Sequence, residues 1–200
     1  IISLTSVISL DLDSIFGWMM AGVSLLVVTG ILEDAVGLSI KVRFAAQTLG
    51  ACVLVLGGGL HVESLGIGIV FLDSIPTWVA VPFTVFALVG LTNGFNMADG
   101  IDGLAAGYVL VGLLLVAATS VLTIGVIPQL EWFVVLFSAV FVFFMVNTSW
   151  IAFKKVFLGD AGSMLLGFIM GGTLIYCSQG PISAIPVSYT HLTLPTTPYV

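Results

Sequence analysis

The sequence is poor in charged residues, histidine and cysteine. Only 7% of its 200 residues are charged, and it holds four Lys and Arg together, two His and two Cys. Soluble domains carry about a quarter charged residues, so this scarcity, with a mean hydropathy of +1.27, excludes that class. The cysteines, Cys52 and Cys177, lie in separate apolar runs and are interpreted as buried small hydrophobic residues rather than as a disulfide.

Long hydrophobic runs fill the sequence instead, and 60% of its residues are hydrophobic. Several runs approach or exceed the ~20 residues that cross a bilayer core. They are continuously apolar and do not alternate in ~10-residue segments, which argues against a transmembrane β-barrel. We predict an all-α fold, a polytopic transmembrane helical bundle with active-site residues in its cytoplasmic loops. The six expected spans are residues 15–32, 44–60, 76–92, 104–124, 130–149 and 162–178.

The basic residues set the expected orientation of this bundle. They are Lys41, Arg43, Lys154 and Lys155. Alternating the spans places the two loops that hold them, 33–43 and 150–161, on the same membrane face as residues 93–103. The opposite face carries acidic residues but no Lys or Arg. Because basic loops stay in the cytoplasm, we expect the first face to be cytoplasmic.

One polar stretch, NGFNMADGIDGLAAG (93–107), stands between two apolar runs. It spaces four polar side chains three residues apart, at Asn93, Asn96, Asp99 and Asp102. On a helix this spacing would form a slowly drifting stripe on one face, and the interleaved glycines allow a backbone or a ligand to approach closely. A simple turn needs only one Asx and one Gly. Polar groups near a bilayer are costly unless satisfied, so the cluster indicates a site.

Two further polar stretches fall on the same predicted face. GILEDAVGLSIKVRFAAQ (30–47) contains the paired acids Glu33 and Asp34, and KKVFLGDAGSMLLG (154–167) contains Asp160. Each has a simpler interpretation, since Lys and Arg at span ends often anchor a helix by snorkelling and Asp160 could cap one. Together with Asp99 and Asp102, however, they bring five acids to one face.

Crowded carboxylates repel one another unless a cation or protons intervene. With oxygen ligands and neither His nor Cys nearby, the suitable cation is hard, Mg²⁺ or Mn²⁺. Mg²⁺ commonly shares its ligands between one or two carboxylates and phosphate oxygens, and the nearby Lys41, Arg43 and Lys155 suit the remaining phosphate charge. The residues alone thus predict a cation-assisted phosphate site on a membrane protein, without naming a substrate.

The three stretches resemble, in order, the motifs of the polyprenyl-phosphate N-acetylhexosamine-1-phosphate transferases. NGFNMADGIDGLAAG is similar to the Asn-x-x-Asn-x-x-Asp-Gly-x-Asp-Gly-Leu-Ala signature, KVFLGDAGSMLLGF to the Gly-Asp-x-Gly segment, and GILEDAVGLSIKVRFAAQ to the paired-acid loop with its basic residue and Gln47. The resemblance covers residues 15–178. It implies an Mg²⁺-dependent transfer of a sugar-1-phosphate from a UDP-sugar, a UDP-N-acetylhexosamine, to undecaprenyl phosphate, which releases UMP and initiates lipid-linked surface polysaccharide.

The resemblance also implies roles for individual residues. Asn96 and Asp160 would be the metal ligands. Four acids would be catalytic, with Glu33 or Asp34 deprotonating or orienting the lipid phosphate and the other two lining the nucleotide pocket: Glu33, Asp34, Asp99 and Asp102. Phe157 would contact the base, and Lys155 with either Lys41 or Arg43 would meet phosphate.

The sequence departs from the family pattern in three ways. The family's paired acids are usually Asp-Asp, whereas this chain has Glu33-Asp34. A His-rich cytoplasmic loop and about four helices of the family fold are not found, so we expect residues 1–186 to be a partial integral-membrane domain that is inactive alone. Residues 187–200 are interpreted as a foreign tail.

The expected partners are the bacterial inner membrane, the lipid phosphate and the nucleotide sugar. The sequence is compatible with a homodimer, and no nucleic-acid partner is expected. Two alternatives remain at this point. A transporter or channel would place intramembrane acids along an ion path, near the midplane rather than at one end of the spans. A catalytically silent scaffold related to the transferases would be consistent with Glu33 and the missing loop.

Overall fold

A computed structural model describes residues 15–62, 75–126, 130–150 and 156–179. Within these ranges the chain is helical and contains no strand. The helices are α1 (Ile15–Val36), α2 (Ile40–Cys52), α3 (Thr77–Ala98), α4 (Leu104–Ile124), α5 (Leu130–Asn147) and α6 (Gly159–Gln179), and α2 continues through a π-helical turn, η2 (Val53–Gly57). Among the described residues, six segments, with α2 and η2 counted as one, are each long and apolar enough to cross a membrane. The predicted all-α bundle of six spans is confirmed, although the ends of the spans differ.

The helices extend further into the polar stretches than we predicted. α1 runs through Glu33 to Val36, α3 continues through Asn96 to Ala98, and α6 already begins at Gly159. The predicted loop boundaries are therefore wrong, because part of each predicted loop is helical: 33–43, 93–103 and 150–161. A helix satisfies its own backbone groups, which lipid cannot do, so it continues past the last apolar side chain.

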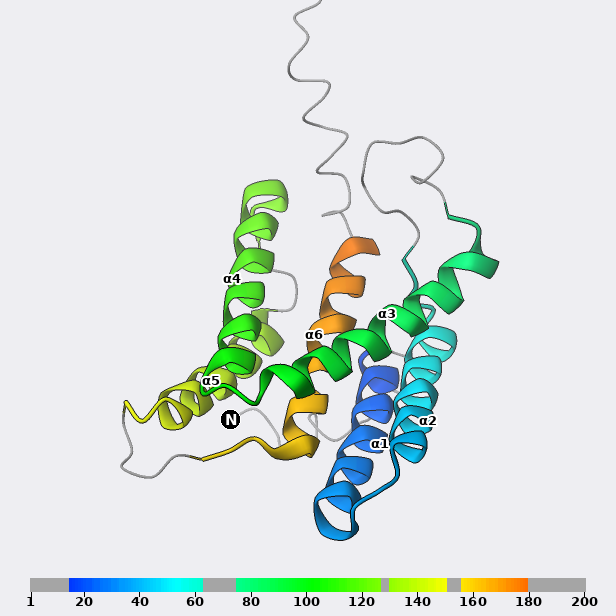
Figure 1. The fold of residues 1–200 in the computed structure, drawn as a ribbon. Coiled ribbons are helices and arrows are strands. Elements are labelled where there is room, and N and C mark those ends of the chain that lie inside the picture. The colour runs from blue at the N-terminus through cyan, green and yellow to red at the C-terminus, as the bar shows by residue number, and fades with distance from the viewer. Residues whose placement is uncertain (1–14, 63–74, 127–129, 151–155, 180–200) are drawn as a thin grey trace, which may run out of the picture.

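α6 lies at the centre of the bundle, between α1 and α3, and α3 crosses it at a steep tilt (Figure 1). Small residues allow this closeness. A Cβ added to Gly167 would stand 2.8 Å from the Cα of Thr92 on α3, so only glycine fits at this crossing.

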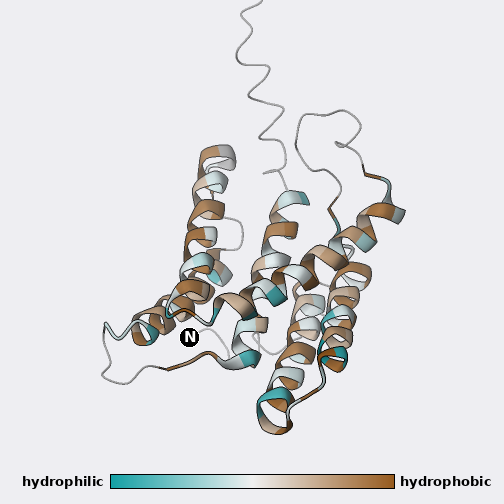
Figure 2. Cartoon of the chain, viewed as in Figure 1, coloured by the Kyte–Doolittle hydropathy of each residue, from teal (hydrophilic) through white to brown (hydrophobic). Residues whose placement is uncertain are grey.

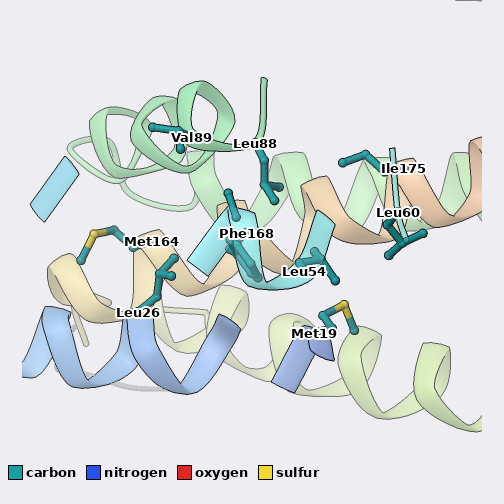
Figure 3. Packing of buried hydrophobic residues seen from close by; sticks show 10 residues of the cluster. Met19, Leu26, Leu54, Leu60, Leu88, Val89, Met164, Phe168 and Ile175 are labelled. Carbon is teal, nitrogen blue, oxygen red and sulfur yellow. The ribbon is translucent and has the colours of Figure 1, made fainter. Parts of the chain in front are cut away.

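Two apolar clusters hold the helices together. The first joins α1, α2, η2, α3 and α6 around Phe168, which is 1% exposed, with Leu26, Leu54, Leu88 and Met164 against it (Figure 3). The second joins α3, α4, α5 and α6. Cys52 and Cys177 are both unpaired, as predicted, although each is only half-buried.

Hydrophilic residues gather at one end of this apolar assembly. Figure 2 shows them at the end of α1, the start of α2 and the start of α6. The end of α3 contributes Asn96, which hydrogen-bonds to Asp160 at the start of α6. Four helix ends therefore meet at one polar site.

Candidate functional site: an acidic cluster at the helix ends

Arg43 lies between two of the predicted site acids. Its Nη1 donates a hydrogen bond to Glu33 Oε1 at 3.1 Å and stands 3.6 Å from Asp160 Oδ2. The side chains of Arg43 and Glu33 are 19% and 15% exposed, so their ion pair is largely shielded from solvent, whereas Asp160 is 39% exposed. Arg43 thus connects α1, α2 and α6 through charge.

Asn96 connects α3 to the same point. Its Nδ2 donates to Asp160 Oδ1 at 2.7 Å and to Ser163 Oγ at 2.9 Å. Ser163 is fully buried, and its hydroxyl donates in turn to the carbonyl of Gly159 at 3.0 Å. Asp160 is therefore held on one oxygen by an amide and approached on the other by a guanidinium.

Asp34 reaches the start of α6 from the last turn of α1. Gly159 has a φ of +70°, which favours glycine, and a Cβ there would stand 3.1 Å from Asp34 Oδ2. The glycine thus lets the carboxylate of Asp34 lie against the backbone next to Asp160. Asp34 thus lies against the residue that precedes Asp160, at the contact between the end of α1 and the start of α6.

Asp99 and Asp102 lie on the turn that follows α3. Burial raises the pKa of Asp99 above its ordinary value, and the negative charge of Asp160 raises it further. This electrostatic interaction places Asp99 in the same acidic group as Asp160. Asp102 is exposed on the turn.

Sequence reasoning missed Asn147, which ends α5 and is 4% exposed. Its Oδ1 accepts a hydrogen bond from the backbone N–H of Gly103 at 2.5 Å, and its Nδ2 donates to the carbonyl of Val156 at 2.9 Å. It therefore ties the turn that bears Asp99 to the segment that leads into α6. The sequence did contain a signal for this role. Asn147 is a single amide at the end of a long apolar run, and a buried polar group needs hydrogen-bond partners.

The remaining predicted site residues are either exposed or outside the described residues. Lys41 is exposed in the first turn of α2, whereas both ion pairs found among the described residues involve Arg43. Phe157 is 71% exposed, three residues before Asp160. Lys154 and Lys155 lie outside the described residues.

Comparison with known proteins identifies the family. The model of the family described as "Glycosyl transferase family 4" matches residues 16–178. The chain belongs to glycosyl transferase family 4. The predicted resemblance is thereby confirmed, and no solved structure matches the chain significantly.

The named relatives of this family 4 chain are prenyl-phosphate sugar-phosphate transferases. It is 35% identical over 149 residues to the "Probable undecaprenyl-phosphate N-acetylglucosaminyl 1-phosphate transferase" of Bacillus subtilis, with 74% of the chain and 40% of the relative covered. It is 32% identical over 181 residues to the "Undecaprenyl-phosphate alpha-N-acetylglucosaminyl 1-phosphate transferase" of Escherichia coli K12, with 83% and 46% covered.

A mycobacterial relative extends the comparison to another prenyl phosphate. The chain is 30% identical over 170 residues to the "Decaprenyl-phosphate N-acetylglucosaminephosphotransferase" of Mycolicibacterium smegmatis, with 80% of the chain and 40% of the relative covered. In all three cases the chain spans less than half the length of the relative.

The chemistry of the family 4 site fits a hard divalent cation with few protein ligands. Among the described residues, no three His, Cys, Asp or Glu side chains are placed to hold a metal. Mg²⁺ needs only one or two carboxylates where phosphate oxygens complete its shell, and Asp160 is a carboxylate of this kind. Asn96 also carries an amide oxygen, although in the structure its amide nitrogen is the atom that faces Asp160. Two buried polar atoms, Glu33 Oε2 and Arg43 Nε, have no hydrogen-bond partner among the described residues, which is expected where a ligand completes a site.

Proposed function

We propose that the protein containing this chain transfers an N-acetylhexosamine-1-phosphate from a UDP-sugar to undecaprenyl phosphate and releases UMP. The observation that carries this proposal is Asp160, whose two oxygens meet Asn96 and Arg43 beside further carboxylates at one end of a membrane-spanning bundle. One substrate is a lipid and the other is water-soluble, so a site at helix ends is open to both. The activities in the names of the three relatives support the same reaction.

On the donor side, Asn96 and Asp160 would hold Mg²⁺ or Mn²⁺ against the pyrophosphate. Bound there, the metal supplies positive charge that offsets the charge developing on the leaving phosphate. Asp99 and Asp102, on the turn after α3, would orient the nucleotide, and the exposed ring of Phe157 is available to contact the base.

On the acceptor side, Glu33 or Asp34 would accept a proton from the lipid phosphate or orient it. The guanidinium of Arg43 already faces Glu33 and would bind phosphate oxygens, a geometry that suits arginine. Lys41 and Lys155 would add positive charge around the site. Glu33 has one methylene more than Asp, and its contact with Arg43 accommodates that length.

The bonds balance as a phosphoryl transfer. An oxygen of the lipid phosphate attacks the β-phosphorus of the UDP-sugar, and a new P–O bond forms. The bond from that phosphorus to the bridging oxygen breaks, and the bridging oxygen leaves with UMP. Such reactions depend chiefly on positioning and electrostatic stabilisation, and the residues at the helix ends would supply both.

We further propose that the polar end of the bundle faces the cytoplasm of a bacterial inner membrane. Lys41 and Arg43 both lie at this end, in agreement with the positive-inside rule. The acids also lie at helix ends rather than near mid-span, which disfavours a transport path. The reaction would start a lipid-linked surface polysaccharide.

The test uses membranes from cells that express the complete protein, with undecaprenyl phosphate and labelled UDP-N-acetylglucosamine. We expect Mg²⁺-dependent label in the organic phase and its loss in Asp160→Asn, because the amide weakens metal binding. The matched control is Glu131→Gln, which neutralises an acid in the first turn of α5, away from the acidic cluster, and should retain activity. Full activity in Asp160→Asn would refute the ligand assignment.

A further inference from the structure

Two successive layers of hydrogen-bonding side chains join α2, α3 and α6. The outer layer is the site itself, where Arg43, Asn96 and Asp160 meet. The inner layer consists of Gln47, Asn93 and Met164, so each helix contributes one residue to each layer. Residues three or four apart share a helix face, and one turn spans about 5.4 Å. The inner layer therefore lies one turn further into the bundle.

The inner layer is an amide–amide pair with two hydrogen bonds. Asn93 Nδ2 donates to Gln47 Oε1 at 2.5 Å, and Gln47 Nε2 donates to Asn93 Oδ1 at 3.4 Å. Gln47 Nε2 also donates to Met164 Sδ at 3.1 Å, while Asn93 Nδ2 donates to the carbonyl of Val89 at 2.8 Å. Gln47 is 1% exposed, so its amide depends on these partners, and Asn93 is half-buried beside it.

The predicted loop 93–103 began at Asn93, and this pairing shows that Asn93 instead belongs to a contact between helices. Asn93 lies on α3, a full turn before the helix ends at Ala98. Apolar packing alone specifies the register of two helices less strictly than a reciprocal amide pair, whose two hydrogen bonds form in only one register. A slip of α3 by one residue would turn Asn96 by about 100° and carry its amide away from Asp160.

We propose that Gln47 and Asn93 are positioning residues, which fix the rotation of α3 and α2 so that Asn96 and Arg43 both meet Asp160. This inference rests on the proposed function for its kinetic consequence only. Its geometric content, the orientation of α3 against α6, does not depend on any activity.

The geometric test is disulfide cross-linking in the complete protein with its other cysteines replaced, including Cys52→Ala and Cys177→Ala. Asn96→Cys and Ser163→Cys form the reporter pair, since these side chains are in direct contact. We expect efficient cross-linking in this background, and a severalfold loss of it when Gln47→Leu and Asn93→Leu are added. The control is Thr84→Val, which removes another fully buried polar group of α3, one that bonds to Ala80 and Val62, and should leave cross-linking unchanged.

The kinetic test compares the same changes in the protein with Asn96 and Ser163 intact. Outer-shell partners of a metal site typically alter activity or metal affinity by about 10- to 100-fold. We expect Gln47→Leu and Asn93→Leu each to lower kcat/KM and raise the Mg²⁺ concentration for half-maximal activity within that range. The swap Gln47→Asn with Asn93→Gln retains both amides and should recover most of the loss, and Thr84→Val should match the unmodified protein.

The outcomes separate the two proposals. Cross-linking that stays unchanged in the Leu variants, or a half-maximal Mg²⁺ concentration equal to that of Thr84→Val, would overturn the positioning role. If the unmodified protein transfers no sugar phosphate, the proposed function fails, while cross-linking still decides whether the amide pair orients α3.

Discussion

Gly30 of α1 lies directly against Ala161 of α6. A Cβ on Gly30 would overlap the Cα and Cβ of Ala161, so only a glycine permits this crossing. Three residues later α1 presents Glu33, and one residue earlier α6 presents Asp160. The closeness of the two backbones thus brings these acids within reach of the same guanidinium.

Replacing Gly30 should therefore damage both stability and activity. We expect Gly30→Val to lower the free energy of unfolding by about 1–3 kcal/mol through overpacking. It should also lower transferase activity, because it separates α1 from α6. Gly90→Ala is the control, because a Cβ at this helical position meets nothing within 4 Å. Thermal unfolding and activity of detergent-purified protein check the prediction, and equal behaviour of the two variants would contradict it.

Gly159 offers a way to separate backbone strain from the contact with Asp34. We expect Gly159→Ala to lower the free energy of unfolding by about 1–2 kcal/mol, because the backbone at this position is left-handed. The added Cβ should also displace the carboxylate of Asp34. Gly125→Ala carries similar strain, at φ +74°, but its Cβ meets no neighbour and it lies at the end of α4. Steady-state kinetics should show a much larger loss of activity in Gly159→Ala; similar losses in both variants would rule out the Asp34 contact as the cause.

Asn147 should matter for activity although it lies outside the family motifs quoted for this chain. Asn147→Leu leaves the Gly103 N–H and the Val156 carbonyl without their partner, a loss that costs about 1–3 kcal/mol per buried group. We expect kcat/KM for the UDP-sugar to fall by about tenfold or more as the turn bearing Asp99 loosens. Ser24→Ala, which removes an exposed hydroxyl of α1 that bonds to its own helix, should be nearly neutral. An active Asn147→Leu enzyme would mean that the turn is held by other contacts.

The ionised carboxylate of Asp99 should destabilise the metal-free protein. Its native pKa is raised by burial and by Asp160, so the native state binds the proton more tightly than the unfolded state. Stability is therefore lost as pH rises through that pKa. We expect Asp99→Asn to raise the Tm of protein in EDTA at neutral pH while lowering activity. A lower Tm in the variant would contradict the repulsion between the two carboxylates.

The sequence predicted the bundle because each span is a continuous apolar run of membrane length, which few other folds produce. It predicted the acidic cluster because three polar stretches fall on one predicted membrane face. The three-residue spacing places Asn93 and Asn96 on one face of α3, but Asp99 and Asp102 lie on the turn after that helix. It misplaced the helix ends, since hydropathy falls at Glu33 and Asn93 although backbone hydrogen bonding continues. The choice of Arg43 over Lys41 at the acids, the pairing of Gln47 with Asn93 and the bridging by Asn147 depend on helix packing, which periodicity does not encode.

The measurement that tests the proposed function most directly follows the β-phosphorus of the donor. UDP-N-acetylglucosamine labelled at its β-phosphate is incubated with undecaprenyl phosphate, Mg²⁺ and membranes that contain the complete protein. Transfer of sugar-1-phosphate predicts labelled lipid with an equal amount of unlabelled UMP, both abolished by Asp160→Asn. Labelled UDP as the product would indicate transfer of the sugar alone, and absence of lipid-linked label with every UDP-N-acetylhexosamine would contradict the proposed function.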